Sequence, residues 1–164
     1  MLKQRLALLV VATLFMLGLT GRSAWAASNP VIAGSVSGTE LCPQSVCRAA
    51  TFAGRFSGQP GDGYWSAGVK HSGLPPAGSC TQITGGRWQL IAGYRYFSGD
   101  VQQGTLCNTS SPGRYDYFTV QAPLRLKKGG TGRIYVSGTL DHTPLYRSPP
   151  QPPTFQGQIT QNAP

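Results

Sequence analysis

Acidic and histidine side chains are scarce in this chain, which limits the catalytic chemistry that it can perform. Its 164 residues include five Asp and Glu and two His, against 14 Lys and Arg. A Ser-His-Asp triad needs a histidine beside an oriented acid and a nucleophile, and glycoside hydrolysis needs two converging carboxylates. Asp141 and His142 are adjacent, so on a strand their side chains would point to opposite faces. The composition therefore favours a non-catalytic protein, with an enzyme as the alternative.

Motifs that hold a metal, a cofactor or a phosphate are absent as well. No G-x-S-x-G nucleophile elbow occurs in the sequence. Four residues separate Cys42 from Cys47 and 26 separate Cys80 from Cys107, and neither spacing matches the usual zinc pairs. The glycine-rich residues 129–132 lie between two expected strands, which indicates a hairpin turn, because a phosphate loop joins a strand to a helix. We predict no metal site and no cofactor.

Long apolar runs are missing everywhere except at the N-terminus. Residues 6–19 carry no charge, follow two positive charges and are followed by a small-x-small sequence at residues 24–26. This run is shorter than the roughly 20 apolar residues of a membrane-spanning helix. A charged start, an apolar middle and a small-residue end are typical of a secretory signal peptide. We predict that residues 1–26 are cleaved after Ala26, which leaves a secreted or periplasmic protein without a membrane span. An uncleaved N-terminal anchor is the alternative.

The remaining positive charges are too dispersed for a nucleic-acid interface. Without residues 1–26 the chain keeps eleven Lys and Arg against five Asp and Glu, a net charge of +6. Only Lys127 and Lys128 are adjacent, whereas nucleic-acid binders cluster such residues on one face. We predict no nucleic-acid partner. The charge serves solubility, or it attracts an acidic or glycan surface.

The first two cysteines flank a short connection between two expected strands. An even number of cysteines in an exported chain argues for disulfides. Residues 31–41 and 48–57 alternate in the manner of strands. A bridge between Cys42 and Cys47 would close the turn between them, so we predict this disulfide.

The other two cysteines bracket a second expected hairpin. Residues 81–92 and 99–106 have strand patterns and would fold back on one another near Gly93. Cys80 and Cys107 are equidistant from that fold and would face each other at its open end, within reach of a disulfide. We therefore predict a disulfide between Cys80 and Cys107.

Glycine and proline are abundant, and the strands are short. The chain has 22 Gly and 13 Pro, and runs of alternating apolar residues are separated by Gly, Pro, Asn and Ser. Residues 115–126, 133–141 and 154–160 add further strands to those named above. We predict an all-β fold, an antiparallel small β-barrel of about seven or eight strands with a β-sandwich as the alternative. Residues 27–160 form a single β domain and residues 161–164 a disordered tail.

Three segments read as loops and one as a modification signal. Residues 59–65 form a turn cluster that ends in two aromatics, residues 72–79 contain two prolines, and residues 148–153 have an extended, polyproline-like sequence. Residues 108–110 match the N-glycosylation pattern.

Alternation predicts which side chains face inward. In residues 115–126, apolar side chains occupy the even positions from 118 onward, while Pro123 indicates an edge position or a break in the sheet. Trp88 is expected to face inward because it alternates with the polar Arg87 and Gln89.

A resemblance arises near the C-terminus. Residues 127–133 read Lys-Lys-Gly-Gly-Thr-Gly-Arg, and residues 138–144 read Gly-Thr-Leu-Asp-His-Thr-Pro. Together they resemble uncharacterised secreted bacterial β-barrel proteins, and the glycine turn is similar to that of dirigent and allene oxide cyclase-like barrels. The resemblance covers residues 115–160 and implies a barrel whose lumen holds a small apolar molecule. It supplies no catalytic residue.

Exposed aromatic rings beside arginine suit contact with a carbohydrate or an acidic polymer. Tyr94 and Tyr96 lie at the expected hairpin tip with Arg87 nearby, and Trp65 ends the turn cluster. We therefore predict Trp65, Arg87, Tyr94 and Tyr96 as ligand-binding residues, although core packing could also account for the rings.

Two functions are consistent with these features. The first is an exported, non-catalytic envelope or extracellular β domain that binds a ligand or a surface glycan. The alternative is a barrel that encloses a small apolar molecule and acts as an isomerase or a cyclase. A lumenal enzyme needs convergent polar groups in an apolar pocket, whereas a binding domain can fill its interior with large side chains. The sequence does not indicate an oligomeric state.

Overall fold

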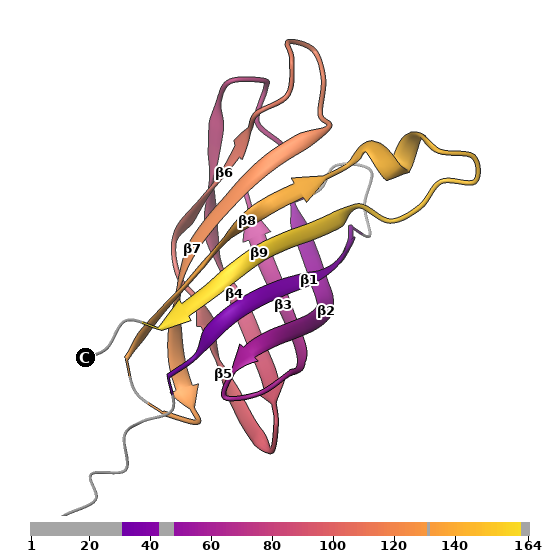
Figure 1. Ribbon diagram of the computed structural model, residues 1–164. Coiled ribbons are helices and arrows are strands. Elements are labelled where there is room, and N and C mark those ends of the chain that lie inside the picture. Colours follow the sequence, from indigo (N-terminus) through magenta and orange to yellow (C-terminus); the bar gives the residue numbers. More distant parts are fainter. Residues whose placement is uncertain (1–30, 43–47, 131, 162–164) are drawn as a thin grey trace, which may run out of the picture.

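Nine antiparallel strands and one short 3-10 helix make up the part of the chain that the structure describes (Figure 1). The structure is a computed structural model that describes residues 31–42, 48–130 and 132–161. The expected signal peptide, residues 1–26, lies outside these residues. The strands are β1 (Ala33–Leu41), β2 (Ala49–Gln59), β3 (Gly63–His71), β4 (Cys80–Ala92), β5 (Arg95–Val101), β6 (Gly104–Asn108), β7 (Tyr117–Lys128), β8 (Arg133–Asp141) and β9 (Thr154–Gln161), and η1 (Thr143–Tyr146) follows β8.

The strands close into a barrel in which neighbours along the chain are neighbours in space. Apart from β5 and β6, which do not pair with each other, each strand pairs with the next one in an antiparallel meander, and β1 pairs with β9 to complete the ring. Strands β5 and β6 share one position, because both pair with β4 on one side and with β7 on the other. The ring therefore has eight positions. The predicted antiparallel barrel is confirmed, and the sandwich alternative is wrong.

Alternating apolar residues fill the interior. In β7 the buried positions are Phe118, Val120, Ala122 and Leu124, as the sequence pattern indicates, while Leu126, the last residue of the predicted inward set, is half-buried. The rings of Phe52, Trp65 and Phe155 meet across the lumen with centroid separations of 5.5 to 6.4 Å. The described residues around the lumen enclose an apolar void of about 40 Å³, and a void of this size holds no more than a few water molecules.

Residues 59–65 are only partly a loop, which corrects the sequence prediction. Strand β2 ends at Gln59 and β3 begins at Gly63, so Tyr64 and Trp65 belong to a strand. Along β3, every second residue from Trp65 to His71 turns inward. The pattern is easy to miss because Ala and Gly separate its larger residues.

Pro123 lies within β7, opposite the break between β5 and β6. Its carbonyl accepts a hydrogen bond from the backbone N–H of Gln102, a residue of that break. In a strand, the nitrogen and the carbonyl of one residue face the same side, so the missing N–H of Pro123 also faces the break. The proline therefore removes no donor from the ladder with β8. Strand β7 itself is unbroken at Pro123, and the interruption lies in the neighbouring position, between β5 and β6.

A disulfide joins Cys80 and Cys107, which are paired residues of β4 and β6. This confirms the predicted bridge at the open end of that hairpin. The second predicted bridge, between Cys42 and Cys47, involves Cys47, which lies outside the described residues. At the C-terminus, β9 runs one residue beyond the predicted strand, to Gln161, and residues 162–164 lie outside the described part.

The two ends of the barrel differ in loop length (Figure 1). Residues 72–79, 109–116 and 142–153 connect strands at one end, which we call the long-loop end. At the other end, β2 and β3, β4 and β5, and β7 and β8 are joined by connections of only a few residues. The buried polar residues of the described chain all lie at the long-loop end, and they are Glu40, His71, Asn108, Asp116 and His142.

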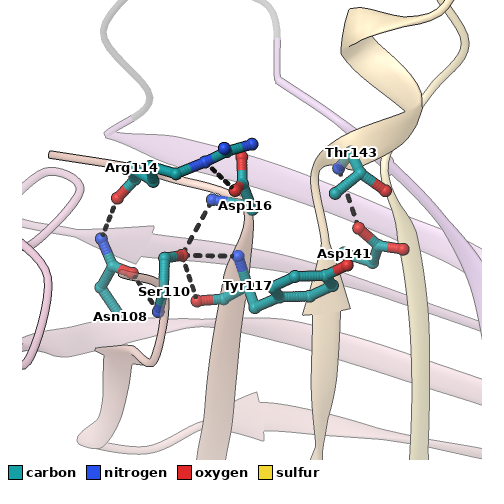
Figure 2. A network of polar contacts seen from close by, with 7 residues as sticks. All are labelled: Asn108, Ser110, Arg114, Asp116, Tyr117, Asp141 and Thr143. Carbon is teal, nitrogen blue, oxygen red and sulfur yellow. Dashed lines mark hydrogen bonds and ion pairs between the residues drawn. The ribbon is translucent and has the colours of Figure 1, made fainter. Parts of the chain in front are cut away.

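Side-chain hydrogen bonds hold the loop of residues 109–116 in place (Figure 2). The hydroxyl oxygen of Ser110 accepts from the backbone N–H groups of Asp116 and Tyr117 at 2.9 and 2.8 Å. The amide of Asn108 donates to the carbonyl oxygen of Arg114 at 3.0 Å, and its side-chain oxygen accepts from the N–H of Ser110. Asn108 is 1% exposed, so the side chain of the glycosylation pattern is a structural element of the fold.

None of the helices in the described residues combines the length and the apolar character that crossing a membrane requires.

Candidate ligand-binding groove

An exposed apolar row crosses the outer face of the barrel at its short-turn end. Tyr64 on β3 pairs with Ile91 on β4, which pairs with Tyr96 on β5. About half or more of each of these side chains is accessible to solvent. Cross-strand partners on one face lie about 5 Å apart, so the three form a continuous strip.

A hollow of about 470 Å³ opens on the outer face above this row, toward the long-loop end. Tyr96 bounds it on one side, and Arg87 and Asp100, which are paired residues of β4 and β5, bound it on the other. The remaining lining residues are Ser66, Gly68, Trp88, Gln89, Ser98, Gly99 and Lys127.

Small polar side chains form the middle of this hollow. Ser66, Gln89 and Ser98 are paired across β3, β4 and β5. The amide of Gln89 donates to the hydroxyl of Ser66 at 2.9 Å, and the hydroxyl of Tyr96 donates to the amide oxygen of Gln89 at 3.5 Å. These bonds orient the amide beside the aromatic ring. A ligand therefore meets a flat ring and fixed uncharged donors and acceptors within one hollow.

The charges around the hollow are unevenly paired. Lys127 lies 2.6 Å from the carboxylate of Asp100, so these two neutralise each other. Arg87 is exposed and forms no ion pair with any residue that the structure describes. The hollow therefore presents one free guanidinium group.

A second hollow of about 640 Å³ continues from the first across β4, β3 and β2. Gly68 and Arg87 line both hollows, whereas Lys70 lines only the second. We call the two hollows together the outer groove. It crosses four strands, from Tyr96 on β5 to Thr51 on β2.

Gly68 lies where the two hollows meet, and no contact within the barrel requires a glycine there. A Cβ atom built on Gly68 has no heavy atom within 4 Å, a property that none of the other described strand glycines shares. Its backbone is also outside the left-handed region. Glycine inside a strand costs about 0.5–1 kcal/mol relative to alanine, and it often marks a close approach by a ligand. Gly68 keeps the passage between the hollows open.

Two of the four predicted binding residues line the outer groove. Arg87 and Tyr96 both border the first hollow, although they come from different rows of the sheet. Tyr94 is fully exposed at the tip of the β4–β5 turn and lies outside the lining. Trp65 points into the barrel, is 6% exposed and donates its indole N–H to the carbonyl oxygen of Ser37. The structure therefore brings Arg87 and Tyr96 together and leaves the other two apart.

The sequence analysis missed most of the groove floor. Gln89 was expected to face outward beside Arg87, and the alternation along β4 could have added it to the site. Ser66 and Gly68 could have been found from the alternation along β3, once that segment is recognised as a strand. Asp100 and Lys127 meet only through the pairing of β5 with β7, which composition does not reveal.

The buried acids and histidines at the long-loop end do not form a second accessible site. His142 approaches Glu40 through Nε2 at 2.8 Å, and both side chains are at least 93% buried. His71 contacts the backbone of Gly73 through Nδ1. Within the described ranges, no three His, Cys, Asp or Glu side chains converge in a way that could hold a metal ion.

Comparisons of this chain with family models, with curated proteins and with solved structures give no match. The resemblance to secreted bacterial barrels and to dirigent and allene oxide cyclase-like barrels therefore stays a prediction.

Proposed function

We propose that this chain is an exported, non-catalytic saccharide-binding domain and that the outer groove is its binding site. One observation supports the proposal above the others. The half-exposed ring of Tyr96 stands beside the paired Gln89 and Ser66, whose amide and hydroxyl are already oriented toward one another.

This combination matches the chemistry of a sugar. A pyranose has apolar C–H faces, which an aromatic ring can cover, and a rim of hydroxyl groups that both donate and accept. Gln89 and Ser66 supply both kinds of partner. Because their mutual hydrogen bond already orders both side chains, less side-chain entropy is lost when the ligand binds.

Export is supported by the signal-peptide pattern of residues 1–26 and by the disulfide between Cys80 and Cys107. Disulfides persist in oxidising compartments outside the cytoplasm. A secreted or periplasmic location would expose the outer groove to glycans of the cell envelope or of the surroundings.

The lumen favours this function over a small-molecule isomerase or cyclase. A ligand pocket occupies about 300–1,000 Å³ and contains a few convergent polar groups. The interior void here is about 40 Å³ and is enclosed mainly by apolar side chains such as Phe52, Trp65 and Phe155. Large aromatic side chains take the space that a lumenal substrate would need.

The test is calorimetric titration of residues 27–164 with a panel of neutral and acidic polysaccharides. Tyr96→Ala is expected to weaken the binding of the best ligand by about tenfold, the equivalent of one aromatic contact. Gln89→Ala should weaken it as well. Tyr135→Ala is the matched control, because Tyr135 is a partly exposed tyrosine on β8, away from the outer groove.

Thermal unfolding of each variant separates a lost contact from a lost fold. The proposal is wrong if no polysaccharide binds, or if Tyr96→Ala and Tyr135→Ala, both folded, bind as the parent does.

A further inference from the structure

We infer that the ligand of the outer groove is a linear acidic saccharide, which crosses the strands over Gly68 and places an anionic group against Arg87. This inference rests on the proposed function and specifies its ligand class. Two observations support it: two positively charged residues of the groove form no ion pair with any described residue, and the passage at Gly68 is open.

The groove has an excess of unpaired positive charge. Its charged lining residues are Arg87, Lys127, Lys70 and Asp100. Asp100 is already bound by Lys127 at 2.6 Å. Neither Arg87 nor Lys70 forms an ion pair within residues 31–42, 48–130 and 132–161. Two positively charged side chains of the groove therefore have no acidic partner in the part of the chain that the structure describes. A guanidinium group can bind a carboxylate or a sulfate through parallel hydrogen bonds.

The two free cations are both neighbours of Gly68 on the outer face. Gly68 pairs with Arg87 across the β3–β4 ladder, and Lys70 follows two residues later on the same outward face of β3. Any side chain at position 68 would project from this face beside both of them. With glycine there, a ligand that contacts Tyr96 and Arg87 can continue toward Lys70 without leaving the surface.

The length of the groove requires a chain of sugars. It spans β5, β4, β3 and β2, which are three inter-strand spacings, or about 14 Å. One pyranose beside Tyr96 cannot also reach Lys70. A linear oligosaccharide can, and its acidic groups would face the two cations in turn.

A carboxylated polymer and its methyl ester test the inference. Polygalacturonate and fully methyl-esterified polygalacturonate share a backbone and differ in charge. The parent protein, as residues 27–164, should bind the acid about tenfold more tightly. Arg87→Gln should abolish this preference, and Lys70→Gln should reduce it. Arg147→Gln is the charge control, because Arg147 is exposed at the long-loop end.

A bulky substitution tests the path of the chain. Gly68→Val should weaken the binding of both polymers by about tenfold and leave the unfolding temperature at or above that of the parent, because a Cβ atom at this position has no heavy atom within 4 Å and valine favours a strand. Ser137→Val on β8 is the bulk control, because Ser137 also faces outward from a strand but lies outside the groove.

The outcomes separate the inference from the proposed function. If the parent binds the acid and the ester equally, the acidic ligand is wrong and saccharide binding stands. If neither these polymers nor any other saccharide binds, both fail. Dextran sulfate and vesicles with anionic lipids report general attraction to polyanions. If both bind as tightly as polygalacturonate and Gly68→Val has no effect on any of them, a diffuse electrostatic surface replaces the inferred site.

Discussion

Glu40 and His142 contact each other at 2.8 Å inside the long-loop end of the barrel, although 102 residues separate them in the chain. Glu40 lies near the end of β1 and His142 directly after β8, so the contact passes over the intervening strand β9. The ring of Phe118 lies 4.9 Å from the imidazole. The two strands that flank β9 are thus joined by a polar contact at this end, in addition to the backbone ladders.

Glu40→Ala is predicted to lower the free energy of unfolding by about 3 kcal/mol, because it leaves the buried imidazole of His142 without its partner. Urea denaturation measures the change. Thr39→Ala is the control, since Thr39 is the outward-facing neighbour. In the double variant with His142→Ala, the loss should be smaller than the sum of the single losses. Purely additive losses would show that the two groups do not interact.

Trp65 and Tyr64 are neighbours on β3 that face opposite sides of the barrel wall. Trp65→Ala empties a site between Phe52 and Phe155, and we expect a loss of about 3–5 kcal/mol. Tyr64→Ala removes an exposed side chain, and the change should stay below about 1 kcal/mol. Equal losses from the two substitutions in denaturant titrations would contradict the assignment of Trp65 to the inward face of β3 and of Tyr64 to its outward face.

The disulfide between Cys80 and Cys107 joins two residues with a sequence separation of 27. Cys80→Ala with Cys107→Ala is predicted to reduce stability by about 3–4 kcal/mol through the freedom gained by the unfolded chain. Gln82→Ala with Thr105→Ala is the control pair, because these residues face each other two positions away without a covalent link. A similar loss in both double variants would mean that the bridge adds nothing beyond strand pairing.

The side-chain amide of Asn108 forms hydrogen bonds inside the fold, whereas that of Gln103 forms one on the surface. Asn108→Ala removes the donor of the buried Pro75 carbonyl and of the part-buried Arg114 carbonyl, so we predict a loss of about 1–3 kcal/mol. Gln103→Ala breaks only an exposed contact with Gln82 and should cost little. Thermal and urea unfolding compare the two, and an Asn108→Ala variant as stable as Gln103→Ala would refute this role.

Local pattern was sufficient for much of the fold. The hairpin of β4 with β5 and β6 could be predicted because Cys80 and Cys107 are equidistant from its turn. The inward face of β7 could be predicted because its apolar residues alternate without interruption. Strand β3 was not predicted, because turn residues precede it and small residues make its alternation of apolar and polar side chains hard to recognise.

The candidate site was predictable only where it depends on one strand. Arg87 and Gln89 face outward together by alternation along β4 alone. Their contact with Ser66 and the approach to Tyr96 depend on the register of β4 against β3 and β5, which a single sequence does not specify. The partner of His142 is even less local, because only closure of the ring brings Glu40 to it.

Closure of the ring between β1 and β9 also sets which way the outer groove faces. Strand β4, at the centre of the groove, and strand β9 are four positions apart in a ring of eight, and Figure 1 shows β3 and β4 behind β9 and β1. Ala33 and Thr160 are paired at this seam, so the first and last strands enter and leave the barrel side by side. A fusion partner or a surface linked through either strand end would therefore hold the groove pointing away from itself, so immobilisation through the C-terminus suits the binding measurements.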